Sequence, residues 1–473
     1  SVDASGTKAF TVDNLTISSG TVNLNLTTYG TFIKGNVTVN SGATLASKSS
    51  SGSLITFSGS SAQTITGAVT IEANSTITLN QDLIIAGSLT AKGNLNLGTS
   101  TVSGIGTLSI GASGIVTTAN AYGIDKTRSL TVGTLTNDAL SYVYNGSVAQ
   151  GTGADLPSTV TNLTINNTST EGVTLTSDEN ISGALTCTAG LLKLGSKNLV
   201  IASGKNITAA YNSYVVTDGT GTLTHTLAAA STPVFAFGTA NGYAPVACNV
   251  TSSGNVVAGT VKPTITNAPL HPNRVIQQEW IFNETVTGTD AGTVSFGWNA
   301  TADGSEFDIS KPVVFASWDG AKYNMDEATP VAGTNGMYTI TIDLPTNIPN
   351  TPLLIGNKSA FVPDAPALTA DASANDVDHD IIITFTDDAA WRAAVTGVSV
   401  NGTALTATTD YTLEAGILTL KPSGGNTLLT TSGTKTVTIA ATGYNDATVS
   451  QVINAGALDM SKSYYEVFNP LTP

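Results

Sequence analysis

The sequence predicts an all-β protein: an N-terminal parallel β-helix (solenoid), followed by a β-sandwich module and a C-terminal β-sandwich. Three observations lead to this prediction. A short strand motif recurs through the first part of the chain, longer alternating strands replace it, and a proline-containing linker precedes a last group of strand-length runs. Charged residues make up only 11% of the 473 residues, a balance typical of all-β extracellular proteins.

The solenoid prediction rests on a repeated three-residue motif, in which Thr or Ser stands between two apolar residues. The copies lie at residues 15–17, 37–39, 69–71, 89–91, 108–110, 130–132, 163–165, 185–187 and 207–209. They begin 22, 32, 20, 19, 22, 33, 22 and 22 residues apart. Repetition at this period indicates about nine coils over residues 1–211, two of them about 11 residues longer than the rest.

Side chains alternate along a strand, so the first and third residue of each motif share one face. We expect the third residues to form one internal column: Ile17, Val39, Ile71, Ala91, Ile110, Val132, Ile165 and Cys187. The Cys187 thiol is then part of the core, and we expect it to be unreactive. With only one further cysteine, Cys248, the sequence predicts no disulfide framework.

Glycines stand two residues before many of these strands, where we expect tight corners with unusual backbone angles. They are Gly35, Gly67, Gly87, Gly106 and Gly183. The two long steps contain similar segments, Phe-Ser-Gly-Ser-Ser-Ala-Gln at 57–63 and Tyr-Asn-Gly-Ser-Val-Ala-Gln at 144–150, so we expect copies of one elaborated coil. Over about residues 10–210 the chain resembles repeat regions of large secreted surface proteins of Bacteroidetes-like bacteria.

Residues 212–360 lose this rhythm and contain longer alternating stretches with aromatic residues. These stretches are 214–216, 234–237, 280–282, 294–298 and 313–318. Period-two alternation bounded by Gly, Asn and Asp predicts an antiparallel β-sandwich, which would cap the open end of the solenoid. This segment resembles the module that often follows such repeats in the same surface proteins.

The proline-containing stretch 361–366 marks the start of a further domain, residues 361–456. Its strand-length runs are 380–386, 400–403, 410–413, 416–420 and 437–444, with a hairpin signal at Asn401-Gly402. From about 364 to 455 the chain is similar to the bacterial domain family named for haemoglobin interaction. That resemblance implies an Ig-like β-sandwich from a secreted or cell-wall protein. Residues 457–473 form a C-terminal aromatic tail with Tyr464, Tyr465 and Phe468.

Charge and hydropathy restrict the partners and the location. A net charge of -15 argues against nucleic acid and against an anionic membrane surface, because both require clustered Lys and Arg. No apolar run approaches the roughly 20 residues that span a bilayer, so we expect no membrane insertion. No charged-then-apolar leader begins at Ser1, and we expect a mature secreted chain at the bacterial cell surface.

A β-helix also suggests polysaccharide lyases and hydrolases, which require carboxylates that converge from neighbouring coils. Instead, Glu72 and Lys92 share one offset on adjacent coils, and Asp138, Glu171 and Lys193 share another. Opposite charges at matching offsets indicate surface charge ladders. The sequence therefore predicts no catalytic, cofactor-binding or metal-binding residue, and no enzyme.

Two ligands remain open for the C-terminal domain. The family resemblance raises haem or haemoglobin binding, for which the candidate residues are His379, Tyr411 and Tyr444. Three acids at an apparent strand entry offer oxygen ligands for Ca²⁺: Asp376, Asp378 and Asp380. A solvated acidic strand edge explains the same three residues without a metal.

We expect an extracellular structural protein, the self-assembling subunit of a bacterial surface fibre or layer, whose main partner is a copy of itself. End-to-end contacts by strand addition would use the open strand edges of a solenoid. One alternative is an adhesin for a glycan or host protein, with Trp280, Trp298, Trp318 and Asp319 on sugars, although core packing explains most of those rings. The other alternative is a β-helix lyase or hydrolase.

Overall fold

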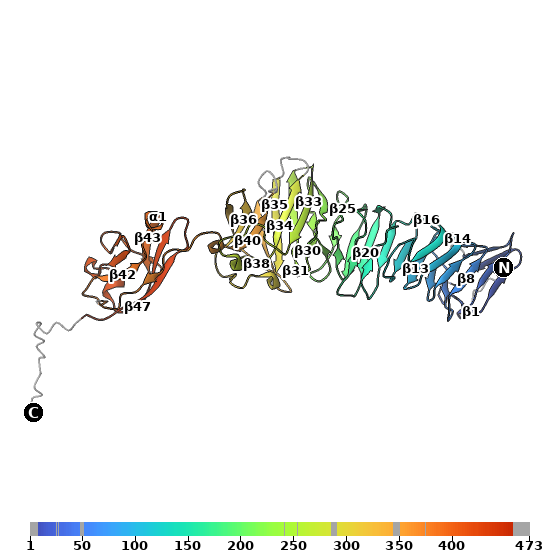
Figure 1. Ribbon diagram of the computed structural model, residues 1–473, viewed down its shortest axis with the longest axis horizontal. Coiled ribbons are helices and arrows are strands. Elements are labelled where there is room, and N and C mark those ends of the chain that lie inside the picture. The colour runs from blue at the N-terminus through green and yellow to red at the C-terminus, as the bar shows by residue number, and fades with distance from the viewer. Residues whose placement is uncertain are drawn as a thin grey trace, which may run out of the picture. The chain divides into compact units, whose positions relative to one another are not determined.

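The computed structural model describes residues 8–24, 26, 28–47, 52–240, 242–252, 254–284, 291–343, 351–373 and 375–456 (Figure 1). The aromatic tail predicted at 457–473 lies outside these residues. The chain forms two compact units, residues 1–268 with 273–357 and residues 269–272 with 358–473. Among the described residues, no helix is long and apolar enough to cross a membrane.

The first face of the solenoid is a ten-stranded parallel sheet with one strand from each coil. In order, the strands are β1 (Phe10–Val12), β4 (Thr31–Ile33), β7 (Leu54–Phe57), β10 (Thr76–Leu79), β13 (Asn94–Gly98), β15 (Ile115–Thr118), β17 (Ser141–Tyr144), β20 (Asn162–Asn166), β23 (Leu185–Ala189) and β26 (Ile207–Thr208). Register partners Ile77 and Leu95 are 18 residues apart, and Val116 and Tyr142 are 26 apart. The solenoid prediction is confirmed, with ten coils of similar length rather than nine.

In the N-terminal half, the second and third faces merge into one sheet. The second face holds β2 (Leu15–Ile17), β5 (Val37–Val39), β8 (Gln63–Thr66) and β11 (Leu83–Ile85), and the third holds β3 (Thr21–Leu24), β6 (Thr44–Ser47), β9 (Ala68–Ile71) and β12 (Ser88–Ala91). The long strand β14 (Val102–Ile110) pairs with both β11 and β12, and β16 (Leu130–Asn137) pairs with the whole of β14. These two strands therefore join the faces across a corner.

In the C-terminal half, the same two faces are built from shorter strands. One carries β18 (Gln150–Gly151), β21 (Val173–Thr174), β24 (Leu192–Lys193), β27 (Val215–Val216) and β30 (Phe237–Thr239), and the other carries β19 (Thr159–Val160), β22 (Glu179–Ile181), β25 (Leu199–Ile201) and β28 (Leu223–Ala228). Because β27 still pairs in parallel with β30, the coiling continues as far as Gly238. The boundary predicted at residue 211 is therefore too early.

The residues of the predicted internal column point inward as expected, but they do not form a single column. All eight of its residues are buried. However, Ile17, Val39 and Val132 lie on the second face, Ile71, Ala91 and Ile110 on the third, and Ile165 and Cys187 on the first. The steps of 32 and 33 residues arise because consecutive motifs lie on different faces: 37–39 on the second and 69–71 on the third, and 130–132 on the second and 163–165 on the first. Each coil carries three strands of similar composition, so the motif alone does not identify the face.

Corner glycines are explained mainly by close stacking of the coils. Of the five predicted glycines, only Gly67 has a left-handed φ, of 86°. At Gly87 a Cβ atom would collide with the backbone of Gly67, and at Gly106 it would collide with Gly87. The prediction of unusual backbone angles is thus confirmed at Gly67 and wrong at the other four, where the neighbouring coil leaves no room for a side chain.

Asn and Asp side chains at the coil corners accept hydrogen bonds from backbone amides that have no partner in the β-sheets. The side chain of Asn14 accepts from the Asn36 amide at 2.8 Å, and that of Asn36 accepts from the Thr64 amide at 2.8 Å. Asp178 and Asn198 repeat the arrangement in later coils. This use of short amide and carboxylate side chains explains why the chain is rich in Asn while charges are few.

The β-sandwich is built directly on the last coil. Strand β28 pairs antiparallel with β33 (Gly254–Lys262), and the sheet continues through β34 (Glu279–Glu284), β40 (Leu353–Asn357), β36 (Val313–Trp318) and β37 (Tyr323–Ala328). The facing sheet holds β29 (Val234–Phe235), β32 (Val246–Ser252), β35 (Ala291–Asn299), β39 (Met337–Asp343) and β38 (Val331–Ala332), while β31 (Gly242–Tyr243) pairs with β30. Fully buried rings, among them Phe235, Phe282 and Phe296, fill the space between the sheets. The predicted capping sandwich is therefore present.

The C-terminal domain contains two four-stranded antiparallel sheets with their own core. One sheet holds β41 (Leu368–Thr369), β42 (Ile381–Phe385), β46 (Ile417–Leu420) and β45 (Tyr411–Glu414); the other holds β44 (Thr403–Ala404), β43 (Val395–Val400), β47 (Gly433–Ala441) and β48 (Ala447–Ile453). The expected hairpin turn joins β43 to β44, with positive φ at Asn401 and Gly402. Its helices are α1 (Ala389–Ala394) and α2 (Thr427–Thr430).

Helix α1 is positioned by its own sequence. Asp388 caps its first turn by accepting from the Ala390 and Trp391 amides at 2.9 and 3.0 Å. The apolar ring of Trp391 is fully buried and meets Phe385 edge to face. The described residues also contain four single 3₁₀ turns: η1 (Pro272–Arg274), η2 (Ala300–Ala302), η3 (Lys358–Ala360) and η4 (Pro422–Gly424).

Candidate functional site

The two similar segments at 57–63 and 144–150 form the same structure. In each, a buried glutamine donates to two carbonyls of the preceding coil and accepts from the glycine amide four residues earlier. Gln63 donates to Ile33 and Gly35 at 2.9 and 2.6 Å, and Gln150 donates to Thr118 and Asn120 at 3.1 and 3.0 Å. The amides of Gly59 and Gly146 donate to the respective glutamines at 2.9 and 2.8 Å. The likeness of the two segments is confirmed, but their coils are not longer than the others, since Ile55 pairs with Ile77 and Tyr142 with Leu163. We call the two glutamines the glutamine clamps, because each bonds to the coil before it.

The predicted charge ladders are present as two ion pairs. Lys92 lies 3.0 Å from Glu72, and Lys193 lies 2.8 Å from Glu171, which lowers the pKa of the Glu171 carboxyl. Asp138 does not join them, because it precedes β17 on the first face whereas Glu171 precedes β21 on another. The ladder prediction is confirmed for four residues and wrong for Asp138. Exposed pairs of this kind contribute little to stability, because water and salt screen them.

Most of the tryptophans proposed for sugar stacking belong to the sandwich core. Trp280 and Trp298 are fully buried, and their indole nitrogens donate to the Ala244 carbonyl and to Asp303, both at 3.1 Å. Trp318 is half-buried and meets Tyr323 edge to face at 5.1 Å. The Asp319 carboxylate is engaged by backbone amides of its own turn. Of the three tryptophans, only Trp318 is exposed enough to stack on a sugar.

The candidate ligand residues of the C-terminal domain have different surroundings. Tyr411 and Tyr444 pack against the domain core. Asp376 lies 2.7 Å from the His379 ring nitrogen, an ion pair that raises the pKa of His379 and lowers that of Asp376. Within the described ranges, no group of three or more His, Cys, Asp or Glu side chains comes together. Calcium binding near Asp376, Asp378 and Asp380 stays a prediction.

One outer surface of the C-terminal domain carries two exposed apolar side chains, with the exposed Glu414 opposite one of them, Ile417. On the sheet β41–β42–β46–β45, Ile382 and Ile417 are 38% and 37% exposed. They are diagonal neighbours, because Ile382 pairs with Thr419 and Ile417 pairs with Thr384. We call these four residues the isoleucine face. Asp387 forms an ion pair with Arg392 at 2.9 Å. The Asp387 carboxylate also accepts a hydrogen bond from the Gly416 amide, next to Ile417.

Two buried ionisable groups in the first unit were missed by sequence reasoning. Glu179 of β22 is 1% exposed, and burial raises its pKa to about 8. His225 of β28 is also 1% exposed and packs against Phe235, and burial lowers its pKa to about 4. The Glu179 signal was present in the sequence, because this acid stands two residues before the inward Ile181 of the same strand.

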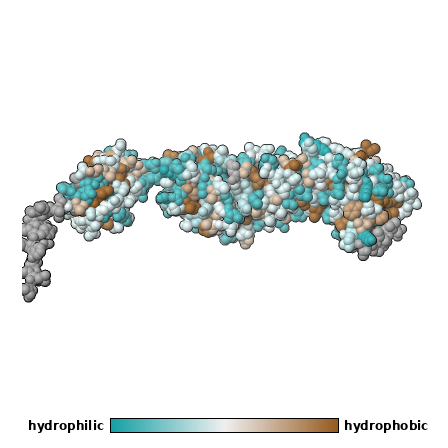
Figure 2. Space-filling view, turned by 90° about the horizontal axis from the view of Figure 1, so that it is seen from below, coloured by the Kyte–Doolittle hydropathy of each residue, from teal (hydrophilic) through white to brown (hydrophobic). Residues whose placement is uncertain are grey.

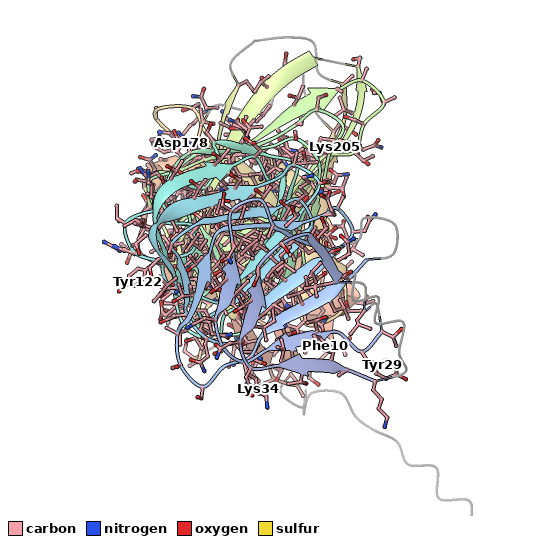
Figure 3. All side chains as sticks on the ribbon, turned by 90° about the vertical axis from the view of Figure 1, so that its right-hand side faces the viewer. Phe10, Tyr29, Lys34, Tyr122, Asp178 and Lys205 are labelled. Carbon is pink, nitrogen blue, oxygen red and sulfur yellow. The ribbon has the colours of Figure 1, made fainter. Side chains whose placement is uncertain are left out.

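The strands of the first coil have a free edge within the described part of the chain. There, β1, β2 and β3 pair only with β4, β5 and β6 of the next coil. Figure 3 looks toward this coil and shows side chains filling the solenoid interior, with Phe10 and Tyr29 near one corner. The Phe10 and Leu15 amides donate to the second coil, so the alternate amides of Thr11 and Thr16 point the other way.

Comparison with known proteins bears on the C-terminal domain. No curated protein and no solved structure matches the chain. Residues 368–454 match the family model described as heme-binding protein Shr-like, Hb-interacting domain. These residues run from β41 to the end of β48 and so cover both sheets of the C-terminal domain. Over residues 368–454, the chain is similar to the Hb-interacting domains of this family of bacterial surface proteins.

Proposed function

We propose that this chain is a secreted, non-enzymatic surface protein in which the solenoid and its sandwich form a scaffold and the C-terminal domain binds a host protein. The observation that carries the proposal is the family match over both sheets of that domain. The family's description names haemoglobin, which we take as the first ligand to test. A scaffold role agrees with the first unit, whose corner side chains and ion pairs are used in holding coils together.

The isoleucine face is the best-supported docking surface for haemoglobin on this domain. Protein interfaces are centred on apolar side chains. Ile382 and Ile417 are as exposed as Ile84 of the solenoid, at 36%, but they adjoin each other within the matched domain. Figure 2 shows that apolar residues are scattered over the face in view.

Biolayer interferometry of the 473-residue chain with haemoglobin tests this function. We expect saturable binding that weakens about ten-fold or more in the double variant Ile382→Lys/Ile417→Lys. The matched control is Ile84→Lys/Ile115→Lys, which adds the same charges to the solenoid and should bind like the parent. Absence of binding contradicts the proposal, and equal loss in both variants contradicts the assigned face.

Self-assembly is a second proposed function, favoured by the one-sided pairing of β1, β2 and β3. Unpaired strand edges recruit strands from other chains, and a second copy would extend the ladders of this coil. Electron microscopy at high concentration should then show regular fibres, and Thr16→Pro should suppress them, because it removes an amide that points away from the second coil. Thr16→Ala is the control. Dispersed particles from the parent chain would contradict assembly.

A further inference from the structure

Glu179 lies in the interior of the solenoid at a position that its neighbours fill with leucine. In register it pairs with Leu199 of β25, which pairs in turn with Leu223 of β28. Its side chain is 1% exposed, and neither carboxylate oxygen makes a hydrogen bond of normal geometry; only the Asn180 amide favours the ionised form, and its influence is smaller than that of burial. An ionised carboxylate without partners in an apolar interior costs several kcal/mol, whereas the neutral acid costs much less.

The groups that face Glu179 do not compensate its charge. The nearest titratable side chains are Tyr142 and Tyr144 of β17, both buried, and their hydroxyls are used elsewhere. Tyr142 donates to Asn137 and to the Ala139 carbonyl at 2.8 and 3.0 Å, and Tyr144 donates to the Thr152 carbonyl at 2.6 Å. Asp138, which also acts on Tyr142, is a further negative charge.

Two residues linked to Glu179, Ser177 two positions before it and Asn137 bonded to Tyr142, also have unsatisfied polar atoms. Among the described residues, buried atoms without a partner include the Asn137 amide nitrogen and the Ser177 hydroxyl, besides both Glu179 oxygens. The strands beside Glu179 are short: β19 contains two residues and β22 contains three. A coil with short strands and unsatisfied polar groups opens locally at a lower free energy than a coil whose strands are long.

We propose that Glu179 is a pH-dependent latch of the solenoid, closed while its carboxyl is protonated and released as that proton is lost. The released state is a local opening around β19, β22 and β25 in which the carboxylate reaches water. The folded pKa of about 8 lies above the unfolded value of 4.5, so the stabilisation is complete below about pH 4.5 and is lost as the pH rises to about 8. Above pH 8 no further loss follows.

Hydrogen exchange with mass spectrometry on the whole chain tests the latch. Each parent peptide is compared with its counterpart in Glu179→Gln at the same pH, which cancels the intrinsic pH dependence of exchange. We expect opening of residues 159–201 in the parent, relative to the variant, to rise about ten-fold per pH unit from roughly pH 5 to pH 8 and then level off. For peptides of β47 in the C-terminal domain, the ratio of opening in the parent to opening in the variant should not change with pH.

A second variant keeps the test decisive if Glu179→Gln disturbs folding. Glu179→Leu continues the leucine column, so it should protect residues 159–201 at neutral pH and remove the pH dependence. Parallel pH profiles for the parent and both variants would overturn the latch. A ratio that rises equally in peptides of both units would overturn it as well, because the opening would then not be local.

Discussion

The solenoid and the C-terminal domain are both built from strands, but their stabilising contacts differ in range. In the solenoid each strand pairs with the strand one coil later, as Leu163 pairs with Leu185, and the pattern repeats. In the C-terminal domain Val400 of β43 pairs with Val437 of β47, and one ring, Trp391, fills a core that has no repeat. Nearest-neighbour contacts allow opening coil by coil, whereas a single core favours all-or-none unfolding.

The largest effect is expected from removing the centre of the non-repeating core. Trp391→Ala should destabilise the C-terminal domain by about 3–5 kcal/mol, because the fully buried ring leaves a large cavity. Scanning calorimetry should show one transition lowered or lost while that of the first unit is unchanged. The half-buried Trp318→Ala provides the control in the other unit. A shift of both transitions in Trp391→Ala would contradict independent cores.

Acid should act on the first unit through His225. Its folded pKa of about 4 lies below the ordinary 6.5, so the neutral ring contributes stability that is present above pH 6.5 and lost as the pH falls toward 4. The full loss is about 3 kcal/mol. Urea unfolding followed by tryptophan fluorescence should show His225→Gln gaining stability relative to the parent as the pH falls from 6.5 toward 4, because the contribution of Glu179 is the same in both chains. The exposed His379→Gln is the control, and an unchanged slope in His225→Gln would refute the assignment.

A medium, local effect is expected at the glutamine clamps. Gln150→Leu leaves the Thr118 and Asn120 carbonyls without their donor and should cost about 2 kcal/mol. Hydrogen exchange should increase around residues 118–124 and not in distant coils. Gln63→Leu is the matched variant, and its effect should centre on Ile33 and Gly35. Loss of protection along the whole solenoid in either variant would show that coils do not open separately.

The smallest effect belongs to the surface ladder. Lys92→Met should change the free energy of unfolding by less than about 1 kcal/mol, because the pair is exposed and screened by salt. A double-mutant cycle with Glu72→Gln measures the coupling, which should shrink further at high salt. A coupling above about 2 kcal/mol, or one that does not depend on salt, would contradict this description of the ladder.

The same difference in range explains how much the sequence could predict. The coils, the inward side chains, the charge pairs and the paired glutamine segments follow from local patterns that repeat. The face on which a motif lies cannot be predicted from these patterns, because Leu15, Val69 and Leu163 stand in the same motif on three different faces. Glu179 carried a local signal, its spacing of two from Ile181, whereas His225 was recognised only from its burial in the structure. The isoleucine face required the pairing of β42 with β46.

The stacked corner glycines have a consequence for how such a chain changes length. Gly67, Gly87 and Gly106 lie over one another, so each is fixed by the coil before it. Inserting one residue between two corners would remove a glycine from this stack and turn inward side chains toward solvent. A whole coil can be duplicated or deleted without either penalty. The coil is therefore the unit of length by which the solenoid can grow or shorten during evolution.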